Sequence, residues 1–127
     1  VRIDANAMIG ARAALHQFVR VGTGAMVAAG AMVSGDVPPW TLVAGDRARI
    51  VGPNAHALRQ HGHANSIPAL RRALRMLWPT TGQPGIDPDK IGLALRDHGA
   101  ADDPVIAHLE GFLLEPSSRS CCSRGRN

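Results

Sequence analysis

The chain has 127 residues, of which 45% are apolar and 19% charged, and its formal net charge is +4. This composition suits one domain or two small ones with a packed core, and it excludes a disordered or collagen-like chain. No apolar run approaches the roughly 20 residues of a membrane span, and the start lacks a signal-peptide pattern. The two cysteines, Cys121 and Cys122, are adjacent, so they cannot staple the fold and a reducing compartment is expected.

The basic residues give no sign of nucleic-acid binding. Of the 14 basic residues all but Lys90 are arginines, and they are spread along the chain. Aromatic residues make up 3% of the chain and do not alternate with the arginines, as a platform for single-stranded nucleic acid would require. We therefore expect no nucleic-acid partner.

Aliphatic residues recur every six positions in the first part of the chain. The anchors are Ile3, Ile9, Leu15, Val21, Val27 and Val33, and small or β-branched residues follow four positions after each. A helix has a period of 3.6 residues and a strand a period of two, so neither explains a strict six. A parallel β-helix of hexapeptide repeats does, with three hexads per triangular coil and the anchors pointing inward.

The coils are expected to end at Asp36-Val37-Pro38-Pro39, because proline cannot donate a hydrogen bond to a further strand. Trp40 to Ala44 suits one more extended stretch. The hexads amount to about two coils, whereas solenoids generally need three or more repeats and a cap. Since an uncapped coil would expose apolar interior, we expect this chain to be the C-terminal part of a longer polypeptide.

From Asn54 onward the pattern becomes helical. Four helices are expected. The first is capped by Asn54 and ends at His61-Gly62, and the second is capped by Ser66. The third runs from Asp87-Pro88 to Gly99, and the fourth begins at Asp103-Pro104. The inward residues of the last three are Ile67, Leu70, Leu74, Leu77 and Trp78; Ile91 and Leu95; and Ile106, Leu109, Phe112 and Leu113. The fold class is therefore mixed, β then α. Residues 1–45 form coils, 46–114 a helical domain and 115–127 a disordered tail.

Four short motifs together resemble one family. They are Leu15-His16-Gln17-Phe18-Val19, Asp36-Val37-Pro38-Pro39, Gly45-Asp46-Arg47-Ala48 and the helix start at Gly52-Pro53-Asn54. They look like the acyl-[acyl-carrier-protein]–UDP-N-acetylglucosamine O-acyltransferases, which perform the first acylation of lipid A biosynthesis. Hexads alone indicate only a hexapeptide-repeat transferase, and the other motifs make the resemblance specific from Ile3 to Phe112.

The resemblance implies a cytoplasmic homotrimer of left-handed parallel β-helices, with active sites between neighbouring subunits. A 3-hydroxyacyl chain would pass from the phosphopantetheine thioester of acyl-carrier protein to the 3-hydroxyl of UDP-N-acetylglucosamine, with no other cofactor. Such a transfer needs a general base and a backbone N–H that holds the oxyanion. The family's base is a histidine about two coils before the His16 hexad. That position precedes Val1, so the resemblance implies no catalytic residue in this segment and no activity of the segment alone.

The resemblance also implies two groups of binding residues. The substrate contacts are His16, Gln17, Asn54, His56, Arg59, Gln60 and His61, and the acyl-chain groove contains Met26, Ala29 and Arg47. Ala29 matches the residue that sets chain length and favours an intermediate to long acyl chain. From the residues alone, His16 and Gln17 also suit an exposed turn, Asn54 a helix cap, and Met26 and Ala29 coil packing.

The sequence departs from the family pattern near the nucleotide. His56 stands where the family usually has a glutamate, and Gln60 and His61 stand in place of an arginine pair. Losing bidentate arginine donors weakens binding of a diphosphate unless other groups replace them. No metal is expected, because His56, His61 and His63 lack a helical i, i+4 pair with a nearby acidic or cysteine ligand. Two alternatives remain: a hexapeptide-repeat acyltransferase for another nucleotide sugar, and a non-catalytic module for trimerisation or carrier-protein binding.

Overall fold

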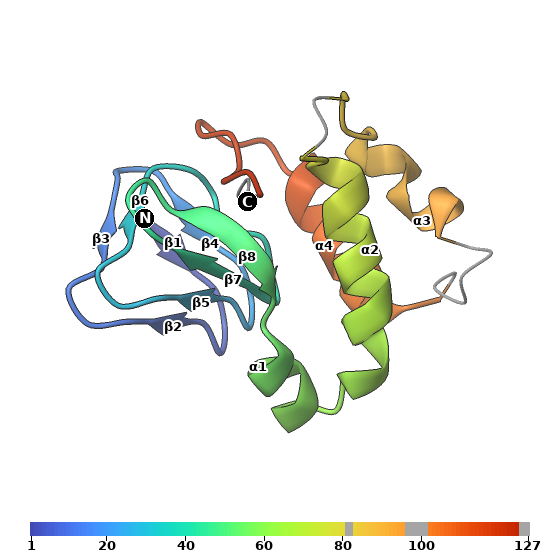
Figure 1. The fold of residues 1–127 in the computed structure, drawn as a ribbon, viewed down its shortest axis with the longest axis horizontal. Coiled ribbons are helices and arrows are strands. Elements are labelled where there is room, and N and C mark those ends of the chain that lie inside the picture. Colours follow the sequence, from blue (N-terminus) through green and yellow to red (C-terminus); the bar gives the residue numbers. More distant parts are fainter. Residues whose placement is uncertain (81–82, 96–101, 125–127) are drawn as a thin grey trace.

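Short parallel strands build the first part of the molecule, which a computed structural model describes for residues 1–80, 83–95 and 102–124 (Figure 1). The strands are β1 (Arg2–Ile3), β2 (Met8–Ile9), β3 (Ala14–Leu15), β4 (Arg20–Val21), β5 (Met26–Val27) and β6 (Met32–Val33). β1 pairs with β4, β2 with β5 and β3 with β6, all in parallel, with the registers Arg2↔Arg20, Met8↔Met26 and Ala14↔Met32. Each partner therefore lies three hexads further along the chain, as the six-residue repeat predicts.

The predicted anchors point into the coils, and stacking decides how far they are buried. Val21, Val27 and Val33 of the second coil are 0% exposed, whereas Ile3 and Ile9 of the first coil are 49% and 38% exposed. In the described part of the chain the second coil has neighbours on both sides and the first coil on one. The burial of an inward position therefore depends on the coil above it as much as on residue type.

Each corner between successive strands contains one residue in the left-handed backbone region. These residues are Asn6, Arg12, Phe18, Gly24 and Gly30, with φ angles of 62°, 61°, 67°, 67° and 72°. Glycine and asparagine adopt this conformation at little cost, but arginine and phenylalanine rarely do. Residue type alone does not reveal these corners, because the geometry of the repeat imposes them.

Parallel pairing continues beyond the segment Asp36–Pro39, where the coils were expected to end. Val37 bridges to Val21, and β7 (Thr41–Ala44) pairs with β5 in the register Val27↔Val43. The prolines do not interrupt the ladder, because they lie in the turn between these two contacts. The extended stretch expected at residues 40–44 is β7. A further strand, β8 (Arg49–Pro53), pairs antiparallel with β7. It lies within residues 46–114, which were assigned to the helical domain, but before the expected helix start at Asn54.

The remaining elements are helical. They are α1 (Ala55–Gln60), η1 (Ala64–Ser66), α2 (Ile67–Leu77), η2 (Pro88–Lys90), α3 (Ile91–Ala94) and α4 (Pro104–Leu114). The predicted inward residues are buried, except that Trp78 and Leu113 are half-buried. The end of the third helix at Gly99 and part of the loop from Thr80 to Gly85 lie outside the described residues.

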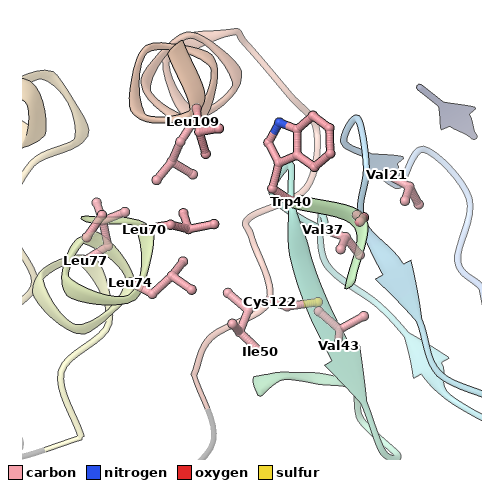
Figure 2. Close-up of a cluster of buried hydrophobic side chains, with 14 of the residues drawn as sticks. Val21, Val37, Trp40, Val43, Ile50, Leu70, Leu74, Leu77, Leu109 and Cys122 are labelled. Atoms are coloured by element: carbon pink, nitrogen blue, oxygen red, sulfur yellow. The ribbon is translucent and has the colours of Figure 1, made fainter. Parts of the chain in front are cut away.

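One continuous core joins the coils to the helices. In Figure 2, Ile50 and Cys122 lie between Val43 of β7 and Leu74 of α2, and all four belong to the same buried cluster. Ile50, Val43 and Leu74 are at most 1% exposed. The two parts predicted as separate domains, 1–45 and 46–114, therefore share their hydrophobic interior.

Of the two predicted helix caps, Asn54 is confirmed and Ser66 is wrong, and Asp103 at the predicted start of α4 is a further cap. The Asn54 Oδ1 accepts a hydrogen bond from the Ala57 N–H (3.3 Å), and the Asp103 Oδ1 accepts from the N–H groups of Val105 (2.8 Å) and Ile106 (3.3 Å). Ser66 makes no side-chain cap to α2; its hydroxyl instead donates to Asp103 Oδ1 at 3.0 Å. A tertiary partner has displaced the local cap.

Replacing Asp103 by alanine should lower the free energy of unfolding by about 1–2 kcal/mol, because α4 loses its cap and Ser66 loses its acceptor. Urea unfolding followed by circular dichroism measures the change. Asp87→Ala is the matched control, because Asp87 also precedes a helix but makes no side-chain cap. Equal effects of the two variants would contradict the assignment of the Asp103 cap.

The segment expected to be a disordered tail packs against the β-helix over residues 115–124. Asp36 pairs with Cys121 and Ile50 with Arg124 in parallel bridges, and the Cys122 side chain is buried. The backbone N–H groups of Asp36 and Ile50 donate to the carbonyls of Ser120 (2.9 Å) and Ser123 (2.8 Å). This segment pairs with the open strand edges through its backbone rather than through its side chains, so its polar composition does not predict this role.

A buried ion pair between Arg20 and Asp36 joins this segment to the coils at the end of the second coil, a position called the coil exit below. Asp36 is 0% exposed and accepts hydrogen bonds from the Arg20 N–H (2.9 Å), the Arg20 Nε (3.0 Å) and the Ser117 Oγ (2.6 Å). The Arg20 guanidinium also lies over the Phe112 ring at 3.9 Å and donates to Glu115. Hydrogen bonds from Arg2, with a smaller contribution from Arg20, hold the pKa of Glu115 below its ordinary value.

Candidate functional site

His16 lies in an exposed turn directly after β3. Its backbone N–H donates to the Val33 carbonyl at 2.9 Å, so the coil fixes its main chain while the ring faces outward. The Arg47 Nη1 lies 3.2 Å from the His16 Nε2. Because a guanidinium only donates, Nε2 is the acceptor and the imidazole carries its proton on Nδ1. The structure therefore brings together two of the predicted site residues from segments far apart in sequence.

A shallow cleft of about 380 Å³ adjoins this pair. It is lined by Ala14, Leu15, His16, Gln17 and Met32. The imidazole and the amide can hydrogen-bond a sugar or a phosphate, and the aliphatic residues can contact an alkyl chain. The cleft thus offers a polar and an apolar surface next to each other.

Asn54 has a structural role that uses both ends of its amide. Its Oδ1 caps α1, and its Nδ2 donates to the Gly24 carbonyl at 2.9 Å. Its backbone N–H donates to the Trp40 carbonyl at 2.7 Å. Asn54 therefore anchors α1 to the coils, which confirms its interpretation as a helix cap.

The other predicted nucleotide contacts lie on or directly after α1. His56, Arg59, Gln60 and His61 are all exposed. The His61 ring also stands 5.7 Å from the Trp40 ring, and His63, which sequence reasoning discounted, stands 5.2 Å from it. Figure 1 shows α1 well away from β3, so one chain does not bring this group to His16 and Gln17.

The predicted acyl-groove residues fall on different faces. Met26 lies on β5, in the sheet β2-β5-β7-β8, whereas His16 follows β3 of the sheet β3-β6. Ala29 is exposed in the turn between β5 and β6. Arg47 lies within hydrogen-bond distance of a predicted substrate residue, His16.

The C-terminal segment creates a second cavity that sequence reasoning missed. This cavity measures about 500 Å³ and includes Arg47, Arg49, Ser120 and Ser123 among its lining residues. Cys121 also lines it, and burial raises the pKa of its thiol to about 12, so the thiol is not a nucleophile at neutral pH. No local sequence pattern predicts the cavity, because its wall forms only when residues 120–123 pack against the coils.

The described residues contain no group of side chains that could bind a metal ion. Among residues 1–80, 83–95 and 102–124, no three His, Cys, Asp or Glu side chains lie close enough together to hold an ion. Nor does any helix there have the length and apolarity to cross a membrane.

Comparison with known proteins identifies the family. The profile described as UDP N-acetylglucosamine O-acyltransferase, domain 2, matches residues 36–122. The chain belongs to this family. The match begins at the coil exit and reaches ten residues beyond Phe112, where the resemblance read from the motifs ended. The C-terminal segment with Cys121 and Cys122 is thus part of the family's domain.

Two curated relatives are acyl-[acyl-carrier-protein]–UDP-N-acetylglucosamine O-acyltransferases. The protein from Paracoccus denitrificans is 35% identical over 93% of this chain and 42% of its own length. The protein from Burkholderia orbicola is 35% identical over 87% of this chain and 42% of its own length. The chain therefore spans less than half the length of these relatives.

Solved structures show the same fold. The Arabidopsis UDP-N-acetylglucosamine acyltransferase matches with a TM-score of 0.78 and 25% identity, over 95% of this chain and 44% of its own. The Bacteroides fragilis enzyme matches with a TM-score of 0.75 and 28% identity, over 94% and 45%. Coils and helices are matched together, since each alignment covers nearly the whole chain.

Proposed function

We propose that this chain is the C-terminal part of an acyltransferase that transfers a 3-hydroxyacyl group from acyl-carrier protein to the 3-hydroxyl of UDP-N-acetylglucosamine, the first step of lipid A biosynthesis in the cytoplasm. The observation that carries this proposal is the 35% identity over 93% of the chain to a relative of that name. The donor arrives as a phosphopantetheine thioester on the carrier, with no other cofactor.

The resemblance to the family supplies the proposed roles of the site residues, and the geometry described above supports those of His16, Gln17 and Asn54. His16, as a neutral imidazole, and Gln17 hydrogen-bond the nucleotide sugar, while Leu15 and Met32 give the same cleft an apolar wall. His56, Arg59, Gln60 and His61 contact the nucleotide from α1, and Met26 and Ala29 line the acyl groove. Asn54 acts by holding α1 in place.

The general base follows from the family resemblance, in which it is a histidine about two coils before the His16 hexad. On this proposal the base that deprotonates the sugar hydroxyl belongs to the part of the relatives that this chain does not span. In the described chain the His16 Nε2 lies 3.2 Å from the Arg47 guanidinium, and the His61 and His63 rings pack beside Trp40. The 127 residues supply binding groups and are inactive alone.

We also propose that the coils wind left-handed and that three copies associate through their sheets. The outward residues of β2, β5 and β7 form an apolar ladder, Met8, Met26 and Leu42, in which Met8 is 57% exposed. Such a ladder suits burial against a neighbouring copy. A trimer would also let α1 of one subunit approach His16 of another.

A chimeric enzyme tests the function. The aligned 42% of the Paracoccus denitrificans protein is replaced by these 127 residues, and transfer from 3-hydroxyacyl-carrier protein to UDP-N-acetylglucosamine is followed by mass spectrometry. We expect acylated product from the chimera and none from the 127-residue chain alone. A folded chimera without product contradicts the proposal. His16→Ala in the chimera should lower kcat/KM about tenfold or more, because one sugar hydrogen bond is lost.

Sedimentation equilibrium of the chimera tests the assembly. A trimer is expected, and it should weaken when Met8 and Met26 are replaced by serine, because the apolar area buried between copies is lost. A monomeric chimera that is fully active would contradict the trimer and the shared site.

A further inference from the structure

The cavity of about 500 Å³ lies where three segments far apart in sequence meet. The end of the second coil contributes Ser34, and the C-terminal segment contributes Ser120 and Ser123. Arg47 comes from the loop before β8, and Arg49 is the first residue of β8. Two arginines and three serines are therefore among the residues that line one cavity. No aspartate or glutamate of the described chain lines it.

The two arginines have no counter-charge in the described chain. Ion pairs there involve Arg2, Arg20 and Lys90, so neither Arg47 nor Arg49 has a carboxylate oxygen within 4.0 Å. Asp36, whose charge acts on the nearby Cys121 thiol, is 0% exposed and already bound by Arg20 and Ser117. Two positive charges around a cavity repel each other, whereas an anion placed between them attracts both.

Arg47 also links this cavity to the candidate substrate cleft. Its Nη1 donates to His16 Nε2 at 3.2 Å, and His16 lines the neighbouring cleft together with Gln17. One hydrogen bond to a neutral ring uses one of the five donors of the guanidinium and leaves the others available. A charged group beside an imidazole and hydroxyls does not suit an alkyl chain, because the chain would displace water from the charge.

We propose that Arg47 and Arg49 form an oxyanion site for a phosphate ester, with the serine hydroxyls as additional donors. This inference rests on the proposed function, which brings two such esters to the molecule: the diphosphate of the nucleotide sugar and the phosphodiester of the donor's phosphopantetheine arm. Arg47 is then a phosphate ligand rather than a wall of the acyl groove.

Titration of the 127-residue chain with inorganic pyrophosphate tests the site, with the Nε–Hε NMR signals of Arg47 and Arg49 as the readout. We expect saturable shifts of both signals, and a shift of the His16 ring nitrogens as Arg47 turns toward the anion. The double variant Arg47→Met/Arg49→Met should weaken binding at least tenfold. Arg72→Met is the matched control, because Arg72 is equally exposed but lies on α2 and does not line the cavity.

Absence of saturable shifts, or equal affinities of the double variant and the control, would overturn the site. Competition then separates the two sources of the ester. Displacement of pyrophosphate by UDP assigns the site to the nucleotide, displacement by 4′-phosphopantetheine assigns it to the donor arm, and displacement by neither overturns the assignment to phosphate esters. If the chimera is active but the 127-residue chain binds no pyrophosphate, this site is overturned and the proposed function stands.

Discussion

Asp36→Asn is expected to lower the free energy of unfolding by about 3–5 kcal/mol, the usual cost of breaking a buried ion pair from one side. Asp36 is 0% exposed and Arg20 7% exposed, so the variant removes the buried anion and leaves the Arg20 cation with only the more exposed Glu115 as a charged partner. The amide also cannot accept all three hydrogen bonds that the carboxylate accepts from Arg20 and Ser117. Urea unfolding at neutral pH measures the loss.

Lys90→Met provides the control for this prediction. It removes an ion pair whose side chains are 64% and 70% exposed, and such pairs contribute about 0–1 kcal/mol. If Asp36→Asn proves too unstable to study, Ser117→Ala deletes the 2.6 Å hydroxyl bond to Asp36 and the acceptor of the Arg119 N–H, and it should cost about 1–2 kcal/mol. If Asp36→Asn lowers the free energy of unfolding by less than about 1 kcal/mol, the Arg20–Asp36 pair does not hold the coils and the C-terminal segment together.

Gly24→Ala should be the second strongly destabilising change, with a cost of about 2–5 kcal/mol. Gly24 has a φ of +67°, and a Cβ at this position would overlap the six-membered ring of Trp40. Trp40 is 5% exposed and packs beside His61 and His63, so its ring cannot move without disturbing the start of the helical part. Tryptophan fluorescence during chemical unfolding reports both the stability and the displaced ring.

Gly30→Ala separates the two causes of this effect. Gly30 has a similar φ of +72°, but a Cβ there meets nothing within 4 Å. It should therefore cost only the about 1–2 kcal/mol of a left-handed alanine, with no change in tryptophan emission. Similar costs for both variants would show that the contact between Gly24 and Trp40 does not constrain the fold.

The elements best predicted from sequence are those with strict local patterns. The six-residue spacing from Ile3 to Val33 predicted parallel coils, and the strand registers confirm three hexads per turn. Likewise the helix start at Asn54 and the inward faces of α2 and α4 follow from caps and apolar spacing. These features depend on neighbours a few residues away, which the sequence displays directly.

The candidate site was predicted residue by residue, but its grouping was not. Resemblance pointed to His16 and Arg47 separately, as a substrate contact and a groove residue, and the structure joins them by a 3.2 Å contact. Within one chain β3, which His16 directly follows, lies well away from α1 (Figure 1). Arg49 and the serines of residues 120–123 carried no signal, because isolated arginines and serines are common on any surface.

The sequence by itself determined the repeat, the change from coils to helices, and the family to which these residues belong. The tertiary structure alone decided that pairing continues past Pro38 and Pro39, that Ser66 serves Asp103 rather than its own helix, and that residues 115–124 close the coil exit. The physical reason is the range of the interactions. Periodicity and caps act within a helical turn or a hexad. The open strand edges at Asp36 and Ile50, and the Asp36 carboxylate that binds Ser117, instead find partners about seventy to eighty residues away, which no local pattern records.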